Sequence, residues 1–224
     1  MKTVGGVGLM LFNLVTNSPQ EFSMNPSSLP GLAGLATEPS ARRSLDAEQC
    51  ALTVIDIQEK LLPAIVNREE VVRNTRVLIR LAEVLKIPVL LTTQYARGLG
   101  NTVTEVSELL PSVKPIDKME FGCFGREEFR TALRELPGCR NTVLLCGIES
   151  HICVMQTALG ALDNGYVVHV ASDAIGSRAE RNWRLGLDRM ESAGCVISST
   201  EMMMYELLQR SGTAQFKEML QYIK

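Results

Sequence analysis

The sequence predicts an α/β fold in three layers (α/β/α), with a parallel sheet covered by helices on both faces. Two observations predict it. From residue 50 onward, apolar strand-like segments alternate with helical segments at short intervals, and the strand segments are apolar throughout. Strands with one face in water alternate apolar and polar residues, whereas continuously apolar strands are typical of a parallel sheet buried on both faces. The chain has 224 residues, 46% of them hydrophobic, which is enough for one sizeable core.

Six strands are expected, each as a short apolar run beside polar or turn-forming residues. The first run, CALTVID, closes on an acid, Asp56, after six residues without charge. Pro88 stands at the start of the second run, IPVLLTT, where a missing N–H group is tolerated. The expected strands cover residues 50–56, 87–93, 114–118, 142–148, 166–173 and 195–199.

Helices are expected between and after these strands. The first has the clearest pattern, because apolar residues or threonines recur at helical spacing while Arg73, Arg76 and Arg80 fall on the opposite face. The loop at 94–112 shows no clear period before a short helical piece. Turn-forming residues end three of the helices: Pro137-Gly138, Asn164-Gly165 and Gly194. The expected helices cover residues 68–86, 125–136, 151–163, 178–193 and 200–209.

Residues 1–47 differ in composition from the domain expected at 48–224. A short apolar run is followed by a stretch rich in Ser, Pro and Gly, where a packed core is not expected. This extension is either disordered, or upstream of a start at Met24, or a cleaved targeting segment. A mitochondrial signal fits because the first acid is Glu21, although such signals carry more arginine. A secretory signal fits the apolar run and conflicts with six unpaired cysteines. A cytoplasmic or mitochondrial location is therefore expected.

Charge and cysteine usage exclude several classes of protein. Lys and Arg number 23 against 25 Asp and Glu, and no basic excess is clustered as nucleic-acid binding would need. No run reaches the 18 or so apolar residues of a membrane-spanning helix. The six cysteines show no CxxC spacing and most lie in or beside apolar runs. That pattern indicates free thiols in a reducing compartment.

Three reactive side chains follow strands of the expected sheet. Asp56 follows the first strand, Lys118 the third, and Cys153 lies in the first turn after the fourth. Each has an ordinary explanation: a helix cap, a solvated lysine and a packed thiol. Because sites in such sheets form at the carboxyl ends of strands, the three together predict an acyl-transfer site with a base, a cation and a nucleophile. A thiol at a helix N-terminus near an ammonium is expected to have a pKa well below its free value of about 8.5.

Several stretches resemble the isochorismatase-like cysteine hydrolases, and most closely the eukaryotic isochorismatase-domain-containing proteins. The resemblance covers roughly residues 48–224. The stretch LLCGIESHICVMQTALGALDNGYVVHVASDAIGSR is the most specific, and it resembles the family's nucleophile motif. Four other stretches are similar to further motifs of the family or of the eukaryotic subgroup: VIDIQEKL, LTTQYARGLGNTVTEV, DKMEFGCF and QFKEMLQYIK. The resemblance implies a six-stranded sheet in the order 3-2-1-4-5-6.

The resemblance also implies how the site works. Asp56, Lys118 and Cys153 match the family's catalytic acid, lysine and nucleophile. The family has a cis peptide in this segment, which here falls between Ile148 and Glu149. In the family it turns an N–H group, here that of Glu149, toward the oxyanion beside the N–H of Cys153. No cofactor is implied, and a homo-oligomer is expected.

One departure from the family bears on metal binding and substrate. The nicotinamidase branch binds a divalent metal through histidines and an aspartate after the second strand, but TTQYARGLGN has neither histidine nor acid. The chain has only His151 and His169, the second in mid-strand and expected in the core. No metal site is therefore expected, and nicotinamide hydrolysis by that route is disfavoured. The sequence shows no clear cluster of cationic residues that could bind the two carboxylates of isochorismate.

The function predicted is hydrolysis of a small molecule, at an amide or related C–N bond, by cysteine nucleophilic catalysis. The competing hypotheses are a binding or scaffold protein that lost turnover, and a thiol sensor. Cys146 is expected to be buried and Cys123 to be a second exposed thiol. The expected pocket residues are Gln94, Tyr95, Phe121 and His151.

Overall fold

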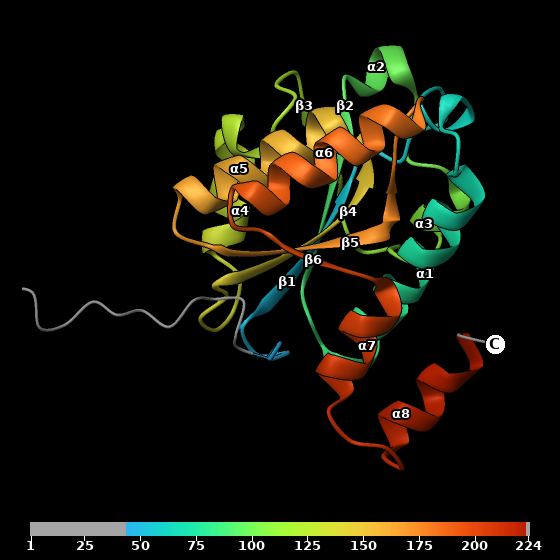
Figure 1. Cartoon of the computed structure of the whole chain (residues 1–224), viewed down its shortest axis with the longest axis vertical. Helices are drawn as coiled ribbons and strands as arrows, with labels where there is room; N and C mark the ends of the chain where they lie inside the picture. Colours follow the sequence, from blue (N-terminus) through green and yellow to red (C-terminus); the bar gives the residue numbers. More distant parts are fainter. Residues whose placement is uncertain (1–43, 223–224) are drawn as a thin grey trace, which may run out of the picture. The chain divides into compact units, whose positions relative to one another are not determined.

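The sheet has six parallel strands in the order β3-β2-β1-β4-β5-β6, which confirms the predicted fold class and strand order. A computed structural model describes residues 44–222 of the chain. In Figure 1 the strands run through the centre of the domain. Their bounds are β1 (Cys50–Ile55), β2 (Val89–Gln94), β3 (Ile116–Lys118), β4 (Thr142–Ile148), β5 (Val167–Gly176) and β6 (Val196–Ser198).

Helices cover both faces of the sheet and give three layers (Figure 1). One face packs against α1 (Arg68–Leu85), α3 (Thr104–Ser107), α7 (Thr200–Leu208) and α8 (Ala214–Met219). The other packs against α4 (Glu127–Arg134), α5 (Met155–Asp163) and α6 (Glu180–Ser192). Shorter turns complete the chain: α2 (Ala96–Leu99), η3 (Leu62–Ala64), η4 (Cys123–Gly125), η5 (Ser150–Val154) and η6 (Leu220–Tyr222).

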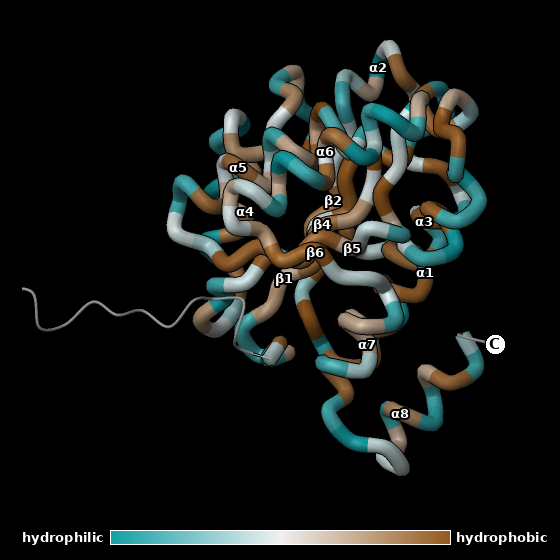
Figure 2. The backbone as a smooth tube through the Cα atoms, in the orientation of Figure 1, coloured by the Kyte–Doolittle hydropathy of each residue, from teal (hydrophilic) through white to brown (hydrophobic). Residues whose placement is uncertain are grey.

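Alternate residues of each central strand enter different halves of the core. In β1, Leu52 and Val54 pack on the side of α1, whereas Ala51 and Ile55 pack on the side of α5. Every residue of β1 is buried, because successive side chains of a strand point to opposite faces and both faces are covered. The brown centre and teal periphery of Figure 2 show the result. The continuous apolar character of the strands thus follows from the three-layer architecture.

Most element bounds differ from the predictions by one or two residues, and two larger differences concern η5 and β5. The helix expected at 151–163 begins with a π-helical turn, η5, before the α-helix starts at Met155. β5 continues to Gly176, three residues past the expected end, and pairs again with β4 after an irregularity between Leu145 and Gly147. Both differences lie beside the predicted nucleophile. They change how the chain approaches that residue and leave the order of elements unchanged.

The expected extension lies almost entirely outside the described residues. Leu45 is nevertheless 3% exposed and its N–H donates to the Glu206 carboxylate at 2.9 Å, so the packed domain begins before residue 48. Whether the preceding segment is a targeting signal stays a prediction. Among residues 44–222, no helix has the length and apolar character needed to cross a membrane.

Candidate active site

The three predicted reactive residues follow strands at the same edge of the sheet. Asp56 leaves β1 in the left-handed region (φ 51°), a conformation that Asp adopts more readily than most residues. Lys118 is the last residue of β3, and Cys153 lies in η5 after β4. Because β3, β2, β1 and β4 are successive neighbours, their carboxyl ends bring these residues into one region.

Asp56 and Lys118 form a fully buried ion pair. The Lys118 Nζ donates to Asp56 Oδ2 at 2.6 Å, to Gln94 Oε1 at 2.9 Å and to the Phe121 carbonyl at 3.1 Å. An ammonium has three donors, so all are used. Lys118 is 1% and Asp56 0% exposed, and such burial is tolerated only when both charges are paired and bonded. Burial lowers the pKa of Lys118, but Asp56 and the nearby thiols outweigh it, so the net shift is upward.

Thr92 holds the second oxygen of the Asp56 carboxylate. The Thr92 hydroxyl donates to Asp56 Oδ1 at 2.8 Å, and the Asp56 N–H donates to the Thr92 carbonyl at 3.3 Å. The pairing of Ile55 with Thr92 in the β1–β2 ladder sets this contact. Both carboxylate oxygens therefore have a named donor, and the side chain has a fixed orientation.

Gln58 fixes Gln94, which in turn contacts Lys118. The Gln58 Oε1 accepts from the Gln94 N–H at 2.7 Å, while its Nε2 donates to the carbonyls of Gln94 (3.1 Å) and Gly100 (2.7 Å). Gln94 also donates to the Met119 carbonyl at 2.9 Å. Sequence reasoning placed Gln94 in the pocket and missed Gln58. The only signal for Gln58 is its position two residues after Asp56.

Gly147 lets β4 approach the end of β1. Its φ is 119°, and a Cβ at this position would lie 2.0 Å from the Ile55 carbonyl oxygen. Only glycine fits there, since it lacks that atom and tolerates the angle. The next peptide bond but one, Ile148–Glu149, is cis. This close approach brings the chain that leads into η5 next to Asp56.

Two neighbours hold the turn that carries Cys153. The Thr157 hydroxyl donates to the Cys153 carbonyl at 2.6 Å and accepts from the Cys123 N–H at 3.0 Å. On the other side, Gly186 of α6 packs so closely that a Cβ would lie 3.0 Å from the His151 backbone. The turn η5, which carries Cys153, therefore lies between the loop before α4 and the helix α6.

The predicted fall in the pKa of Cys153 is wrong. Burial raises this pKa, the negative charge of Asp56 raises it further, and the positive charge of Lys118 only partly opposes them. The prediction assumed that the ammonium of Lys118 and the helix N-terminus would both lower the pKa of Cys153. It did not anticipate that Lys118 is neutralised by Asp56, or that the thiol would be 6% exposed. At neutral pH the resting residue is therefore a thiol beside a carboxylate.

The expectation that Cys123 is exposed is also wrong, since its exposed fraction is 0%. Burial and the Asp56 charge raise its pKa to about 11, against the opposing effect of Lys118. The loop after β3 turns inward at Cys123 because its amide bonds to Thr157. Cys146 is buried as predicted, and the exposed cysteine of the described chain is Cys139.

Comparison with known proteins identifies the family. The family model for the isochorismatase domain matches residues 50–202. The chain belongs to the isochorismatase family. The secreted isochorismatase effector Isc1 of Phytophthora sojae (strain P6497) is 37% identical over 196 residues, covering 86% of this chain and 93% of the relative. Isochorismatase domain-containing protein 2 of Rattus norvegicus is 36% identical over 188 residues, covering 83% and 87%. The predicted resemblance to the eukaryotic proteins is confirmed.

Solved structures share the isochorismatase fold. One described as MAR1 ribonuclease from Caenorhabditis elegans has a TM-score of 0.75 at 33% identity, and the match covers 81% of this chain and 92% of that one. The YcaC gene product of Escherichia coli, described as an octameric hydrolase of unknown specificity, has a TM-score of 0.75 at 24% identity, with 80% and 90% covered. The second likeness shows the fold alone.

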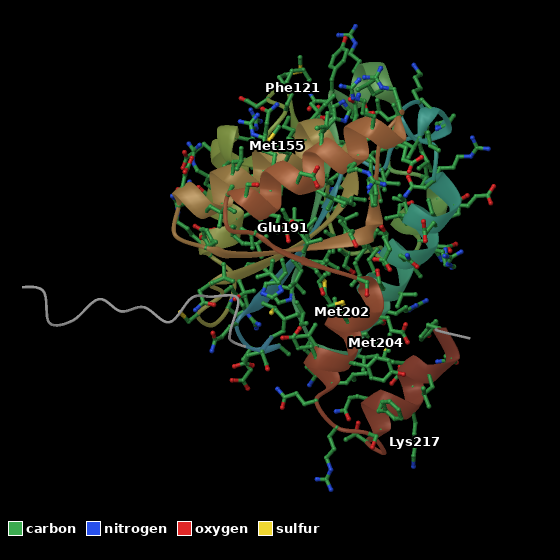
Figure 3. All side chains as sticks on the ribbon, viewed as in Figure 1. Phe121, Met155, Glu191, Met202, Met204 and Lys217 are labelled. Carbon is green, nitrogen blue, oxygen red and sulfur yellow. The ribbon has the colours of Figure 1, made fainter. Side chains whose placement is uncertain are left out.

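The predicted pocket residues of this isochorismatase-family chain fall into two groups. Gln94 and the Phe121 carbonyl contact Lys118 directly, and the Tyr95 N–H donates to the Lys118 carbonyl at 3.0 Å. The side chains of Tyr95 and Phe121 are exposed, 44% and 55%, and Figure 3 shows Phe121 at the end of the domain where α2 lies. His151 belongs to a separate group: its Nδ1 lies 3.0 Å from the Ser177 hydroxyl and its Nε2 3.4 Å from Asn182 Nδ2.

Glu149 is paired with Arg178, whereas His169 lies in the core. The Glu149 carboxylate accepts from the Arg178 N–H at 2.9 Å and pairs with its guanidinium at 3.0 Å. His169 is 3% exposed in β5, as expected of a core residue, and burial lowers its pKa. Within residues 44–222, no three His, Cys, Asp or Glu side chains are grouped so that they could hold a metal ion.

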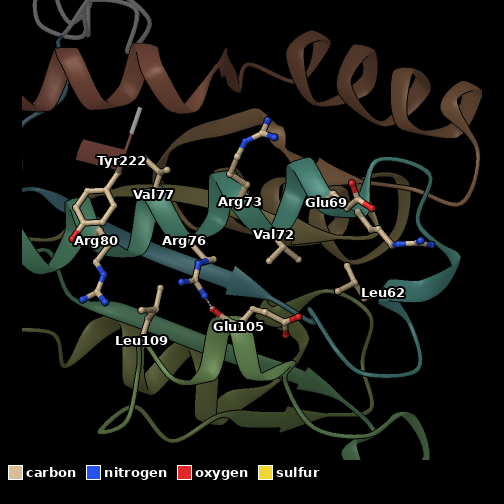
Figure 4. A pocket seen from close by; sticks show the side chains of 11 residues that line it. Leu62, Glu69, Val72, Arg73, Arg76, Val77, Arg80, Glu105, Leu109 and Tyr222 are labelled. Atoms are coloured by element: carbon tan, nitrogen blue, oxygen red, sulfur yellow. Dashed lines mark hydrogen bonds between the residues drawn. The ribbon is translucent and has the colours of Figure 1, made fainter. Parts of the chain in front are cut away.

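A cavity of about 510 Å³ lies away from this chemistry, along α1 (Figure 4). Its wall combines arginines of α1, such as Arg73 and Arg76, with apolar side chains such as Val72 and Leu109. None of Asp56, Lys118 or Cys153 lines it. We place the candidate active site where Asp56, Lys118 and Cys153 converge, because a thiol, a buried carboxylate and a buried cation lie together there and not among the residues that line the cavity.

Proposed function

We propose that this protein hydrolyses a small molecule, at an amide or related C–N bond, with Cys153 as nucleophile, Asp56 as base and Lys118 as the supporting cation. One observation carries the proposal. The Asp56 carboxylate is fixed by two donors at 2.6 and 2.8 Å, and its negative charge is one of the causes that raise the pKa of the Cys153 thiol, after burial. A protonated thiol beside an oriented base is the arrangement that general-base activation requires.

The reaction proceeds through a thioester. As Cys153 Sγ attacks the carbonyl carbon, its proton passes to Asp56, and the N–H groups of Glu149 and Cys153 hold the oxyanion. The C–N bond then breaks and Asp56 returns the proton to the leaving nitrogen. Water attacks the thioester while Asp56 takes its proton, the C–S bond breaks, and the proton returns to Cys153. Lys118 holds the Asp56 side chain in its orientation throughout.

The surroundings favour an uncharged substrate. Lys118 spends its three donors on protein groups, so it has none for a substrate carboxylate. Arg178 is paired with Glu149. The exposed rings of Tyr95 and Phe121 follow the ends of β2 and β3 and offer apolar contact to a small molecule. Substrate contacts from Gln94 and His151 belong to the same proposal.

The decisive experiment compares two thiols of one chain. The protein is treated at pH 7.5 with p-nitrophenyl acetate, and acetylation of Cys153 and of exposed Cys139 is followed by peptide mass spectrometry. The reaction forms an S–C bond, breaks the C–O bond and releases p-nitrophenolate. We expect Cys153 to acetylate at least tenfold faster than Cys139 despite its raised pKa, because a general base contributes at least that much. Simple amides are then screened for turnover that Cys153→Ala abolishes.

If Cys153 acetylates no faster than Cys139 and no amide is turned over, the scaffold hypothesis replaces this one. The sensor hypothesis is weakened by the raised pKa of Cys153, since oxidants attack thiolates. A homo-oligomer, supported by the description of the octameric bacterial neighbour, remains a proposal that light scattering tests. The absence of nucleic-acid binding also remains a proposal, which a ribonuclease assay checks. A cytoplasmic or mitochondrial location remains a proposal as well.

A further inference from the structure

The two oxygens of the Asp56 carboxylate have different partners, and only one partner is charged. Oδ2 accepts from Lys118 at 2.6 Å and Oδ1 from the Thr92 hydroxyl at 2.8 Å. A single donor would let the carboxylate turn about its own axis. Two donors on separate strands fix its plane, and a base must hold its plane toward the thiol it deprotonates. Thr92 is completely buried, so no solvent could substitute for its hydroxyl.

The Thr92 hydroxyl donates to Asp56 and accepts a hydrogen bond from a second residue, Cys123. A carboxylate only accepts, so the single hydroxyl proton of Thr92 points to Asp56 and its oxygen is free to accept another bond. The Cys123 Sγ lies 3.9 Å from that oxygen and donates to it. The raised pKa of Cys123, about 11, keeps this thiol protonated at neutral pH. The chain therefore runs from Cys123 through Thr92 to Asp56.

Cys123 also connects to the turn that carries the nucleophile. Its N–H donates to the Thr157 hydroxyl at 3.0 Å, and that hydroxyl donates to the Cys153 carbonyl at 2.6 Å. The adjacent Gly122 packs against Gln156 so closely that a Cβ would lie 3.1 Å from its Cβ. One buried residue thus links the threonine that holds the base to the threonine that holds the nucleophile.

We propose that Thr92 and Cys123 are positioning residues, which orient Asp56 toward the Cys153 thiol through a one-directional hydrogen-bond chain. The inference rests on the proposed function, because it assigns a role to groups that act through Asp56. Thr92 contacts the base, Asp56, and Cys123 acts through Thr92. Their effect must therefore appear in the step that transfers the thiol proton, and must be smaller in reactions that need only a thiolate.

The test uses matched pairs of variants: Thr92→Val against Thr92→Ser, and Cys123→Ala against Cys123→Ser. The first member of each pair removes the donor, whereas Thr92→Ser keeps the hydroxyl and Cys123→Ser replaces the thiol donor by a hydroxyl donor. We expect Thr92→Val to slow acetylation of Cys153 by p-nitrophenyl acetate at pH 7.5 about tenfold, as loss of a hydrogen bond to a charged group implies. Thr92→Ser should stay within about threefold of wild type, and the Cys123 pair should follow the same order with smaller differences.

Alkylation of Cys153 by iodoacetamide at pH 9 separates positioning from structural damage. This reaction needs the thiolate and no base, so each variant should stay within about threefold of wild type. Equal slowing of acetylation and alkylation in Thr92→Val, or failure of Thr92→Ser to restore acetylation, would overturn the proposal. Asp56→Asn separates the two layers of inference. If it acetylates like wild type, the proposed function fails; if it does not and Thr92→Val does, only the positioning role fails.

Discussion

The carboxyl-edge cluster and the cavity beside α1 both contain cations, but they hold them in opposite ways. In the cluster, Lys118 is 1% exposed and each of its donors has a partner at 3.1 Å or less. Along the cavity the arginine side chains reach solvent and pair with acids of the same surface. Arg76 lies 2.6 Å from Glu108, and Arg73 is 3.9 Å from Glu70.

The comparison indicates that burial of charged groups, more than the presence of a cavity, distinguishes the candidate active site. A buried charge interacts strongly with its neighbours because little water screens it, so small displacements change its chemistry. Exposed pairs are screened and contribute little. Substitutions in the cavity wall should therefore have small effects, whereas substitutions in the buried cluster should have large ones. Three substitutions test this contrast, each with a control at an exposed or loosely packed position.

The largest effect is expected for Gly147→Ala. The added Cβ would lie 2.0 Å from the Ile55 carbonyl oxygen at a φ of 119°, so β1 and β4 must separate beside Asp56. We expect a loss of about 5 kcal/mol in the free energy of unfolding, measured by urea denaturation. Gly165→Ala is the control: its φ is 81°, but no atom lies within 4 Å. It should lose only about 1–2 kcal/mol. Equal losses would show that the two strands can move apart freely.

Lys118→Met comes next, compared with Arg76→Met. The first leaves the Asp56 carboxylate buried without its cation, which is expected to destabilise the fold by about 3–5 kcal/mol. The second removes a pair whose side chains are 38% and 50% exposed, for which about 0–1 kcal/mol is expected. Both are measured by urea denaturation at pH 7.

A double variant checks the cause of the Lys118 effect. Lys118→Met with Asp56→Asn removes both charges, so it should be more stable than Lys118→Met alone. If it is less stable, packing of the lysine stem, and not the unpaired carboxylate, explains the loss.

The architecture could be predicted because a sheet that is buried on both faces requires continuously apolar strands, which are easily recognised in the sequence. The strand expected at 142–148 matches β4 in both bounds, and the helix expected at 68–86 matches α1 to within one residue. The π-helical turn that carries Cys153 could not be predicted from the sequence, because a single turn with a different number of residues does not disturb the helical spacing of the apolar residues. The extension of β5 was missed because Ser172 and Asp173 interrupt the apolar run, although Ala174 and Ile175 after them are buried.

The reactive residues were predictable and their electrostatics were not. Asp56 and Lys118 follow apolar strands and therefore stand out in the sequence. Thr92 and Cys123 act through contacts with residues more than 25 positions away. In the sequence Thr92 looks like an ordinary strand residue, and Cys123 was expected to be exposed. The pKa of Cys153 was predicted with the wrong sign because burial raises it most, the charge of Asp56 raises it further, and the opposing ammonium of Lys118 is directed at Asp56. An ammonium directed at a carboxylate cannot also acidify a thiol to the extent that a free one would.

The smallest of the three effects is expected for Asp56→Asn, and its sign is the most informative. The Asp56 charge raises the pKa of Cys153, so its removal lowers that pKa and increases the thiolate fraction at any pH below it. Nucleophilicity falls more slowly than the thiolate fraction rises, which leaves a net gain of about threefold in alkylation rate for each unit of pKa decrease. Iodoacetamide labelling of Cys153 at pH 8, with exposed Cys139 as internal reference, measures it. The same variant should lose acetylation by p-nitrophenyl acetate, because the base is gone. Faster alkylation with slower acetylation separates a thiol that relies on a neighbouring base from one that is simply acidic, and slower alkylation would mean that Asp56 does not govern this sulfur.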